Sequence, residues 1–172
     1  MTNQRIVIIG FMGTGKTTVA HELGRKLNCL AVDLDELITS RKSRSPSEII
    51  EQDGENEFRR IEAQLLSEVL EEERARIIAV GGGAWTIAAN RQLIAKRGAF
   101  TVWLDADFEL CWKRIEVGRE ARPLARSREM AQQLYGERRP VYELADARIT
   151  VSERDSAAEI ATKVANEISR RQ

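Results

Sequence analysis

A glycine-rich segment near the N-terminus has the residue types and spacing of a phosphate-binding loop. Residues 10–17 read Gly-Phe-Met-Gly-Thr-Gly-Lys-Thr, which fits the pattern of glycine, four residues and Gly-Lys-Thr without a mismatch. The glycines let backbone N–H groups turn toward a phosphate, and a following helix adds partial positive charge. We expect Lys16 to reach the β- and γ-phosphates of ATP or GTP and the Thr17 hydroxyl to bind Mg²⁺. An ordinary glycine-rich turn would not need the lysine, the hydroxyl, the strand and the helix together.

Two carboxylates follow the second apolar run of the chain. The sequence Val-Asp-Leu-Asp at 32–35 places Asp33 and Asp35 at the carboxyl edge of a predicted sheet, where ligands of open α/β folds bind. With an alternating pleat, both side chains point toward the phosphate-binding loop. One carboxylate could help to hold the metal while the other accepts a hydroxyl proton from an acceptor. The alternative is that Asp33 or Asp35 caps the helix that continues through Glu36.

Glycines and basic side chains further along could contact anions. The run Gly81-Gly82-Gly83 would let a ligand reach main-chain N–H groups, although a plain flexible turn is the alternative. Basic residues concentrate in and around the irregular segment 116–130; they are Lys113, Arg114, Arg119, Arg122, Arg126 and Arg128, with Arg138 and Arg139 soon after. This concentration indicates an anion-facing surface or a lid that closes over phosphates. For any single arginine, a solvated surface is the simpler explanation.

Strands and helices in alternation must position these residues. Short, continuous apolar runs are typical of strands buried on both faces of a parallel sheet, and they cover residues 6–9, 30–32, 77–80, 100–104 and 149–151. Helical spacing follows the loop at about 16–27 and recurs in Phe58, Ile61, Leu65 and Val69 and in Ile160, Val164 and Ile168. The alternation predicts an α/β layered fold with right-handed crossovers. The least regular segment, 116–130, is the best candidate for a mobile loop or lid.

Composition excludes several classes of protein. The chain has 172 residues, which predicts one domain over 1–172, and its 42% hydrophobic content is enough for a core. Its 27 basic and 27 acidic residues cancel, so it lacks the overall charge of a nucleic-acid binder. Two cysteines are too few for a disulfide framework or a four-thiolate zinc site, and they suit a reducing compartment. With no signal-peptide core or membrane span in the sequence, we expect a cytoplasmic monomer with neither membrane nor nucleic-acid partners.

Six blocks of sequence in order resemble the shikimate kinase family. They are Gly-Phe-Met-Gly-Thr-Gly-Lys-Thr-Thr at 10–18, Asp-Leu-Asp at 33–35, Asp-Gly-Glu-Asn-Glu-Phe-Arg-Arg-Ile-Glu at 53–62, Gly-Gly-Gly-Ala at 81–84, Arg-Pro-Leu at 122–124 and Arg-Arg-Pro-Val-Tyr at 138–142. The resemblance covers about residues 5–170. It implies ATP-dependent phosphorylation of the 3-hydroxyl of shikimate, a step toward chorismate and the aromatic amino acids. It also implies a three-layer P-loop kinase fold with a central five-stranded parallel sheet and a mobile lid at about 114–128.

The resemblance also implies a role for each site residue. Those that would bind the nucleotide are Gly13, Thr14, Gly15, Lys16, Thr17, Thr18 and the lid residue Arg122, with Lys16 and Arg122 also catalytic. Thr17 and Asp33 would serve Mg²⁺, the latter through water. Asp35 would bind the shikimate hydroxyls and orient or deprotonate the nucleophile. The residues that would bind the shikimate carboxylate are Arg59, Arg138 and, through its backbone N–H, Gly82. The adenine pocket stays open, with Arg114 and Glu153 or Arg154 as its candidates.

Elementary chemistry supports this division independently. Shikimate has one carboxylate and three hydroxyls, so its site needs planar cationic donors at one end and an acceptor at the other. Glu55 and Glu62 stand four residues before and three after Arg59, so either could orient its guanidinium along a helix. His21 is expected on the surface, and Trp85 either forms a wall of the acceptor site or packs in the core.

Three other functions share some of these features. A gluconate-type sugar-acid kinase or a nucleoside monophosphate kinase would have the same loop and sheet but not this combination of blocks. A non-catalytic nucleotide switch would hydrolyse ATP slowly and without an acceptor. A pseudoenzyme retained for binding is disfavoured because every motif residue named above is intact.

Overall fold

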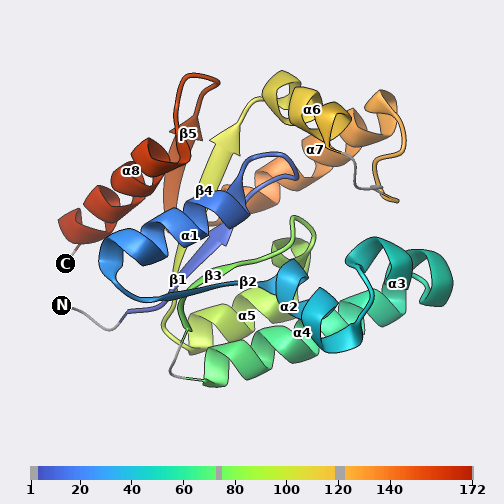
Figure 1. Cartoon of the computed structure of the whole chain (residues 1–172), viewed down its shortest axis with the longest axis horizontal. Coiled ribbons are helices and arrows are strands. Elements are labelled where there is room, and N and C mark those ends of the chain that lie inside the picture. Colours follow the sequence, from blue (N-terminus) through green and yellow to red (C-terminus); the bar gives the residue numbers. More distant parts are fainter. Residues whose placement is uncertain (1–3, 73–74, 119–122, 172) are drawn as a thin grey trace.

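Five parallel strands form the centre of the molecule. The structure, a computed structural model, describes residues 4–72, 75–118 and 123–171. Its strands are β1 (Ile6–Ile9), β2 (Leu30–Asp33), β3 (Ala75–Ala79), β4 (Phe100–Ala106) and β5 (Ala147–Val151). They lie in the order β2-β3-β1-β4-β5, and each neighbouring pair is parallel (Figure 1). The predicted five-stranded parallel sheet is confirmed.

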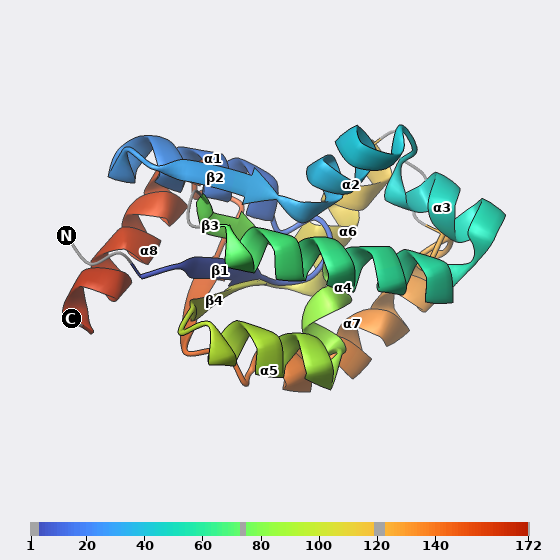
Figure 2. The same ribbon diagram turned by 90° about the horizontal axis from the view of Figure 1, so that it is seen from below.

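Helices cover both faces of this sheet. They are α1 (Lys16–Leu27), α2 (Leu34–Lys42), α3 (Pro46–Asp53), α4 (Glu55–Glu71), α5 (Ala88–Lys96), α6 (Phe108–Val117), α7 (Arg128–Tyr142) and α8 (Ala157–Arg170), with a short 3₁₀ helix η1 (Ala84–Thr86). Helices α1 and α8 pack together on one face, whereas α4, α5 and α7 lie on the other (Figure 2). The predicted three layers are therefore present. In the described part of the chain, no helix is both long and apolar enough to cross a membrane.

The connections between strands reverse direction next to β1. From β1 the chain passes through α1 to β2 at one edge, whereas from β3 it passes through α5 to β4 on the other side of β1. A reversal of this kind leaves a crevice at the carboxyl ends of the strands, which is where open α/β sheets bind ligands. The segments that follow β1, β2 and β3 all meet at this edge, and they contain the motifs singled out in the sequence.

Local side-chain caps determine where several helices begin. Ser45 and Glu48 form a reciprocal capping box at the start of α3, and Ser156 and Glu159 form another at the start of α8. Helix α1 begins differently, because its N-cap is Gly15 in a left-handed conformation (φ 89°) with no side-chain cap. The N–H groups at the start of α1 are therefore not satisfied by a capping side chain, as an anion-binding helix terminus requires.

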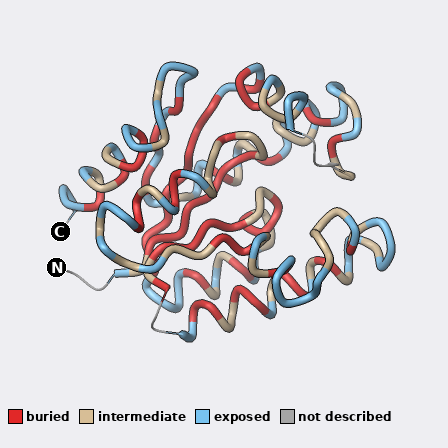
Figure 3. The backbone as a smooth tube through the Cα atoms, viewed as in Figure 1, coloured by how far each residue is buried: buried red, intermediate tan, exposed pale blue. Residues whose placement is uncertain are grey.

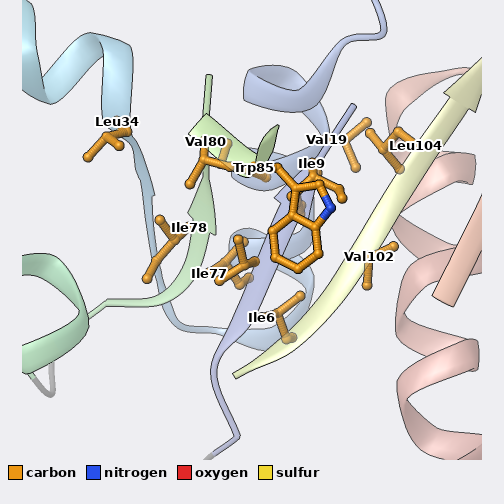
Figure 4. Packing of buried hydrophobic residues seen from close by; sticks show 14 of the residues in the cluster. Ile6, Ile9, Val19, Leu34, Ile77, Ile78, Val80, Trp85, Val102 and Leu104 are labelled. Carbon is orange, nitrogen blue, oxygen red and sulfur yellow. The ribbon is translucent and has the colours of Figure 1, made fainter. Parts of the chain in front are cut away.

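The core lies along the three central strands. All residues of β1 and β4 are buried, as Figure 3 shows, and aliphatic side chains from the sheet pack together around them (Figure 4). The two edge strands differ from the prediction of burial on both faces. Leu30 in β2 is 53% exposed, and residues 148 and 150 of β5 alternate with buried neighbours. An edge strand receives less cover from the flanking helices than a central strand does.

Candidate active site

The loop after β1 has the backbone geometry that its glycines predict. Gly10, Gly13 and Gly15 have φ angles of 149°, 81° and 89°, which side-chain-bearing residues rarely adopt. A Cβ on Gly13 would also lie 2.6 Å from the Cys111 carbonyl oxygen. The Lys16 ammonium crosses the loop and donates to the Phe11 carbonyl at 3.0 Å. The loop is thus a close-fitting backbone cradle with a cation at its centre.

Asp33 caps a helix, which is one of the two predicted alternatives, and it also lies against the Thr17 hydroxyl. One carboxylate oxygen accepts the Thr17 hydroxyl at 2.6 Å. The other accepts the backbone N–H groups of Asp35 and Glu36 at 2.9 and 3.2 Å, which makes Asp33 the N-cap of α2. The described residues contain no group of three or more acidic, histidine or cysteine side chains that could hold a metal by themselves. A hydroxyl next to a carboxylate nevertheless offers the hard oxygen ligands that Mg²⁺ prefers.

The argument from the strand pleat was wrong for Asp35. Strand β2 ends at Asp33, and Asp35 lies in the first turn of α2, so the two residues do not alternate along one strand. The strand ends here because Asp33 caps the helix with its own side chain. Both carboxylates still face the same cleft, since the helix starts at the carboxyl edge of the sheet.

A cleft of about 370 Å³ joins the cradle to the other predicted residues. Those that line it are Gly13, Gly15, Lys16, Thr17, Thr18, Asp33, Asp35, Arg59, Gly82 and Arg138. Thr14 does not line it, because its buried side chain donates to the Phe11 carbonyl at 2.9 Å. Arg122 lies outside the described residues. The cleft is also lined by Ile50 and Phe58. No sequence pattern predicted this, since Phe58 belongs to a helical pattern typical of the core.

Arg59 is held between two carboxylates on its own helix. It donates to Glu55 one turn before it, at 3.2 and 3.3 Å, and to Glu62 at 2.7 Å. Glu62 is fully buried, and burial raises the pKa of its carboxyl to about 7 although the Arg59 guanidinium acts against that rise. Burial acts to lower the pKa of Arg59, yet Glu62 and Glu55 raise it on balance. The guanidinium therefore stays charged and has its orientation fixed from both sides.

Each of the three glycines after β3 lies against a different site group. A Cβ on Gly81 would lie 2.8 Å from Glu62 Oε1 and 3.3 Å from Asp35 Oδ1. On Gly83 it would lie 2.2 Å from Arg59 Nη2. On Gly82 it would lie 3.2 Å from Arg138 Nη1 and from the Tyr142 hydroxyl, which donates to the Gly82 carbonyl at 2.7 Å.

Among the described residues, only some of the clustered basic side chains line the cleft. Arg114 lines it and donates to the Gly13 carbonyl at 3.1 Å, which places this adenine-pocket candidate at the cradle. Arg138, 8% exposed, lines the cleft as well. Three other members of this group form ion pairs elsewhere; they are Lys113 with Glu153, Arg128 with Glu109 and Arg139 with Asp105. Sequence proximity alone could not distinguish these two groups.

Trp85 belongs to the core. It is 4% exposed, lies among the side chains of β1, β3 and β4 in Figure 4, and donates from Nε1 to the Val141 carbonyl at 2.9 Å. It is not part of the cleft lining. Of the two alternatives for this residue, packing in the core is therefore the one that the structure supports. His21 is on the surface as expected, where it faces Glu36 at 3.5 Å.

Comparisons with known proteins point in one direction. The family model described as shikimate kinase matches residues 12–169. A shikimate kinase of Prochlorococcus marinus (strain NATL2A) is 34% identical over 96% of this chain and 83% of its own length. One of Sulfurihydrogenibium sp. (strain YO3AOP1) is 33% identical over 98% and 99%. The structure of shikimate kinase from Acinetobacter baumannii in complex with shikimate superposes with a TM-score of 0.88 at 30% identity, over 98% of this chain and 94% of that one.

Proposed function

The chain belongs to the shikimate kinase family and phosphorylates shikimate with ATP, and we propose that its cleft divides this reaction between a phosphate end and an acceptor end. The phosphate end is the loop after β1 with the start of α1. The acceptor end is formed by Asp35, Arg59, Gly82 and Arg138. The single observation that carries this proposal is that both sets of residues line one continuous cleft.

At the acceptor end, two arginines suit a carboxylate. Arg59 is held by Glu55 and Glu62, and Arg138 is nearly buried on α7. Planar guanidinium groups bind carboxylates through paired hydrogen bonds, and burial strengthens these bonds. Gly82 adds a main-chain N–H at a point where a Cβ would lie in tight contact with Arg138, 3.2 Å from Nη1. We assign the carboxylate of shikimate to these three residues.

Asp35 is assigned to the reacting hydroxyl. Its carboxylate lies close to Gly81 and lines the same cleft as the two arginines and the cradle. As the 3-hydroxyl oxygen forms its bond to the γ-phosphorus, the bond from that phosphorus to ADP breaks, and the hydroxyl proton passes to Asp35. A carboxylate in this position also orients the hydroxyl before reaction.

The phosphate end stabilises charge on the transferring group. We assign the polyphosphate to the backbone N–H groups of Gly13 and Gly15, with Lys16, Thr17 and Thr18 at the start of α1. The predicted contact with Thr14 rests on the family resemblance, since its backbone N–H donates to the Phe11 carbonyl at 3.3 Å. Phosphoryl transfer depends on positioning and charge stabilisation more than on covalent chemistry, so Lys16 should contribute strongly to rate. Arg122, from a lid at about 114–128, stays a prediction from the family resemblance.

A magnesium ion would be held by Thr17 and Asp33. Their oxygens lie 2.6 Å apart and are of the type that Mg²⁺ binds. When bound, the ion neutralises charge on the phosphates and fixes their orientation. Asp33 meanwhile keeps α2, and with it Asp35, in place by capping the helix.

Several further expectations accompany this assignment. We propose that Arg114 lies against the adenine ring, because it already contacts the cradle at Gly13. A single domain, a monomeric state and a cytoplasmic location remain predictions from the sequence.

The experiment is an assay of ADP release with Mg-ATP and one acceptor in each well: none, shikimate, gluconate or a nucleoside monophosphate. We expect strong turnover only with shikimate. Product analysis should place the phosphate on the 3-hydroxyl. Turnover with another acceptor instead would preserve the phosphate end and contradict the acceptor end. Slow hydrolysis that ignores every acceptor would indicate a nucleotide switch and would also contradict the acceptor end.

A further inference from the structure

One buried hydroxyl lies between two groups assigned to the acceptor end. Tyr142 is at the end of α7 and is 2% exposed. Its hydroxyl donates to the Gly82 carbonyl at 2.7 Å, although the two residues are 60 positions apart. Arg138, one helical turn earlier on α7, lies next to the same side chain and acts to lower the pKa of the Tyr142 hydroxyl. Gly82, in the loop after β3, and Arg138, on α7, therefore both lie next to the Tyr142 hydroxyl.

Tyr142, Gly82 and Arg138 lie close enough together for the tyrosine hydroxyl to affect the orientation of the other two. A Cβ placed on Gly82 would lie 3.2 Å from both Arg138 Nη1 and the Tyr142 hydroxyl, so the three groups converge on one point. Glycine has no side chain to restrict its backbone angles. A hydrogen bond to the Gly82 carbonyl fixes the plane of the Gly82–Gly83 peptide. The neighbouring peptide, which presents the Gly82 N–H, shares its Cα with this plane and so starts from a fixed point.

We propose that Tyr142 is a positioning residue of the acceptor end, whose hydroxyl holds the Gly82 main chain and the Arg138 guanidinium where one carboxylate can contact both. This inference rests on the proposed roles of Gly82 and Arg138. The tyrosine itself need not touch the substrate. It acts through the two groups that do.

A second hydrogen bond, from Trp85, holds the same two segments together without the Tyr142 hydroxyl. Trp85 Nε1 donates to the carbonyl of Val141, the neighbour of Tyr142, and so joins η1 to α7 without touching Gly82 or Arg138. The two segments are therefore held together even without the tyrosine hydroxyl. Burial also raises the pKa of Tyr142 to about 12, so the hydroxyl keeps its proton and remains a donor at working pH.

The test compares Tyr142→Phe with Tyr135→Phe. Both tyrosines lie on α7 and donate to a main-chain carbonyl, but Tyr135 donates to Ala106, at 2.9 Å and away from the acceptor end. The assay measures kcat and KM for ATP, for shikimate and for its neutral methyl ester. We expect Tyr142→Phe to raise KM for shikimate about five- to tenfold and to reduce the preference for shikimate over the ester. KM for ATP and kcat should stay within about twofold, and Tyr135→Phe should leave all of these values within that range.

The outcomes distinguish this inference from the assignment beneath it. An unchanged KM and ester preference in Tyr142→Phe, or equal losses in both variants, would overturn the positioning role. No preference for shikimate over the ester in the unsubstituted protein would instead refute the carboxylate site itself. Phenylalanine keeps the aromatic ring of Tyr142, whose centroid lies 6.1 Å from that of the Trp103 ring. Because KM and the preference do not depend on how much protein is folded, assays at low temperature remain decisive if stability falls.

Discussion

The two ends of the cleft are built in different ways. The phosphate end is one continuous segment, residues 10–18, whose contribution comes mainly from backbone geometry and the start of α1. The acceptor end draws single side chains from α2, α4 and α7 and a glycine from the loop after β3. The first end is thus fixed by local sequence, whereas the second exists only after distant elements have packed. Substitutions should therefore affect the two ends separately, and the following predictions test that separation.

The largest effect is expected from one catalytic substitution at each end. Lys16→Met removes the charge at the cradle, and Asp35→Asn removes the base at the acceptor hydroxyl. Each should lower kcat by about 10³-fold or more, since charge stabilisation and general-base catalysis contribute on this scale. Shikimate binding to Lys16→Met and ATP binding to Asp35→Asn, measured by calorimetry, should remain close to those of the unsubstituted protein. Near-normal turnover in either variant would refute the role assigned to that residue.

The next effect concerns the pH dependence of stability that the buried Glu62 carboxyl should produce. The pKa of Glu62 rises from its ordinary 4.5 to about 7 in the folded protein. Between these values the unfolded chain releases the proton while the folded protein keeps it, so the free energy of unfolding falls as pH rises. The loss over this window is roughly 3 kcal/mol, at about 1.4 kcal/mol per pKa unit. Urea unfolding from pH 4.5 to 7.5 should show that Glu62→Gln flattens this slope.

Glu55→Gln is the matched control for that measurement. Glu55 pairs with the same arginine, but its side chain is 48% exposed whereas that of Glu62 is fully buried. It should leave the slope close to that of the unsubstituted protein. Equal slopes in all three proteins would mean that Glu62 does not retain its proton on folding.

A smaller effect separates the two ends by substrate. In Gly83→Ala the new methyl group would lie 2.2 Å from Arg59 Nη2, so the guanidinium must leave its position between Glu55 and Glu62. We expect KM for shikimate to rise about tenfold, consistent with the loss of a charge-assisted hydrogen bond, with KM for ATP unchanged. Arg59→Ala should give the same pattern. A rise in KM for ATP instead would show that the two ends are not independent.

The smallest effect is expected from a glycine that does not line the cleft. Gly136 lies within α7, and a Cβ there would meet no atom within 4 Å. Gly136→Ala should stabilise the protein by about 0.5–1 kcal/mol, because alanine favours helix over glycine, and should leave all kinetic constants unchanged. Thermal unfolding and the ADP assay would check this. A loss of activity would imply that α7 tolerates no change near the acceptor end.

Much of the fold was predictable because its signals are local. The apolar run at 6–9 and the helix at 16–27 have the same bounds in the structure, and the periodic positions Phe58 to Val69 lie in α4. The two edge strands were predicted, but their burial on both faces was not confirmed, since the burial of a strand depends on which neighbours the topology gives it. The position of Asp35 in a helix was also missed, because a capping aspartate can end a strand without any change in apolar pattern.

The site was predictable to a different degree at its two ends. The cradle follows from spacing alone. Asp35 and Gly82 were singled out by their places after predicted strands, whereas the carboxylate-binding roles of Arg59 and Arg138 came from the family resemblance. The burial of Glu62, the packing of Trp85 in the core and the contact between Tyr142 and Gly82 depend on long-range packing. No spacing rule connects residues 60 positions apart.

The triple glycine after β3 also has a genetic consequence. Every missense change in a glycine codon adds at least one carbon atom, and at residues 81–83 that atom would meet, in turn, a carboxylate pair, a guanidinium with a phenol, and a second guanidinium. A saturation library selected for growth on this activity should therefore return three adjacent codons almost without accepted variants. A lineage would then alter what the acceptor end binds through other residues of the cleft, such as Ile50 and Phe58, and not through these glycines.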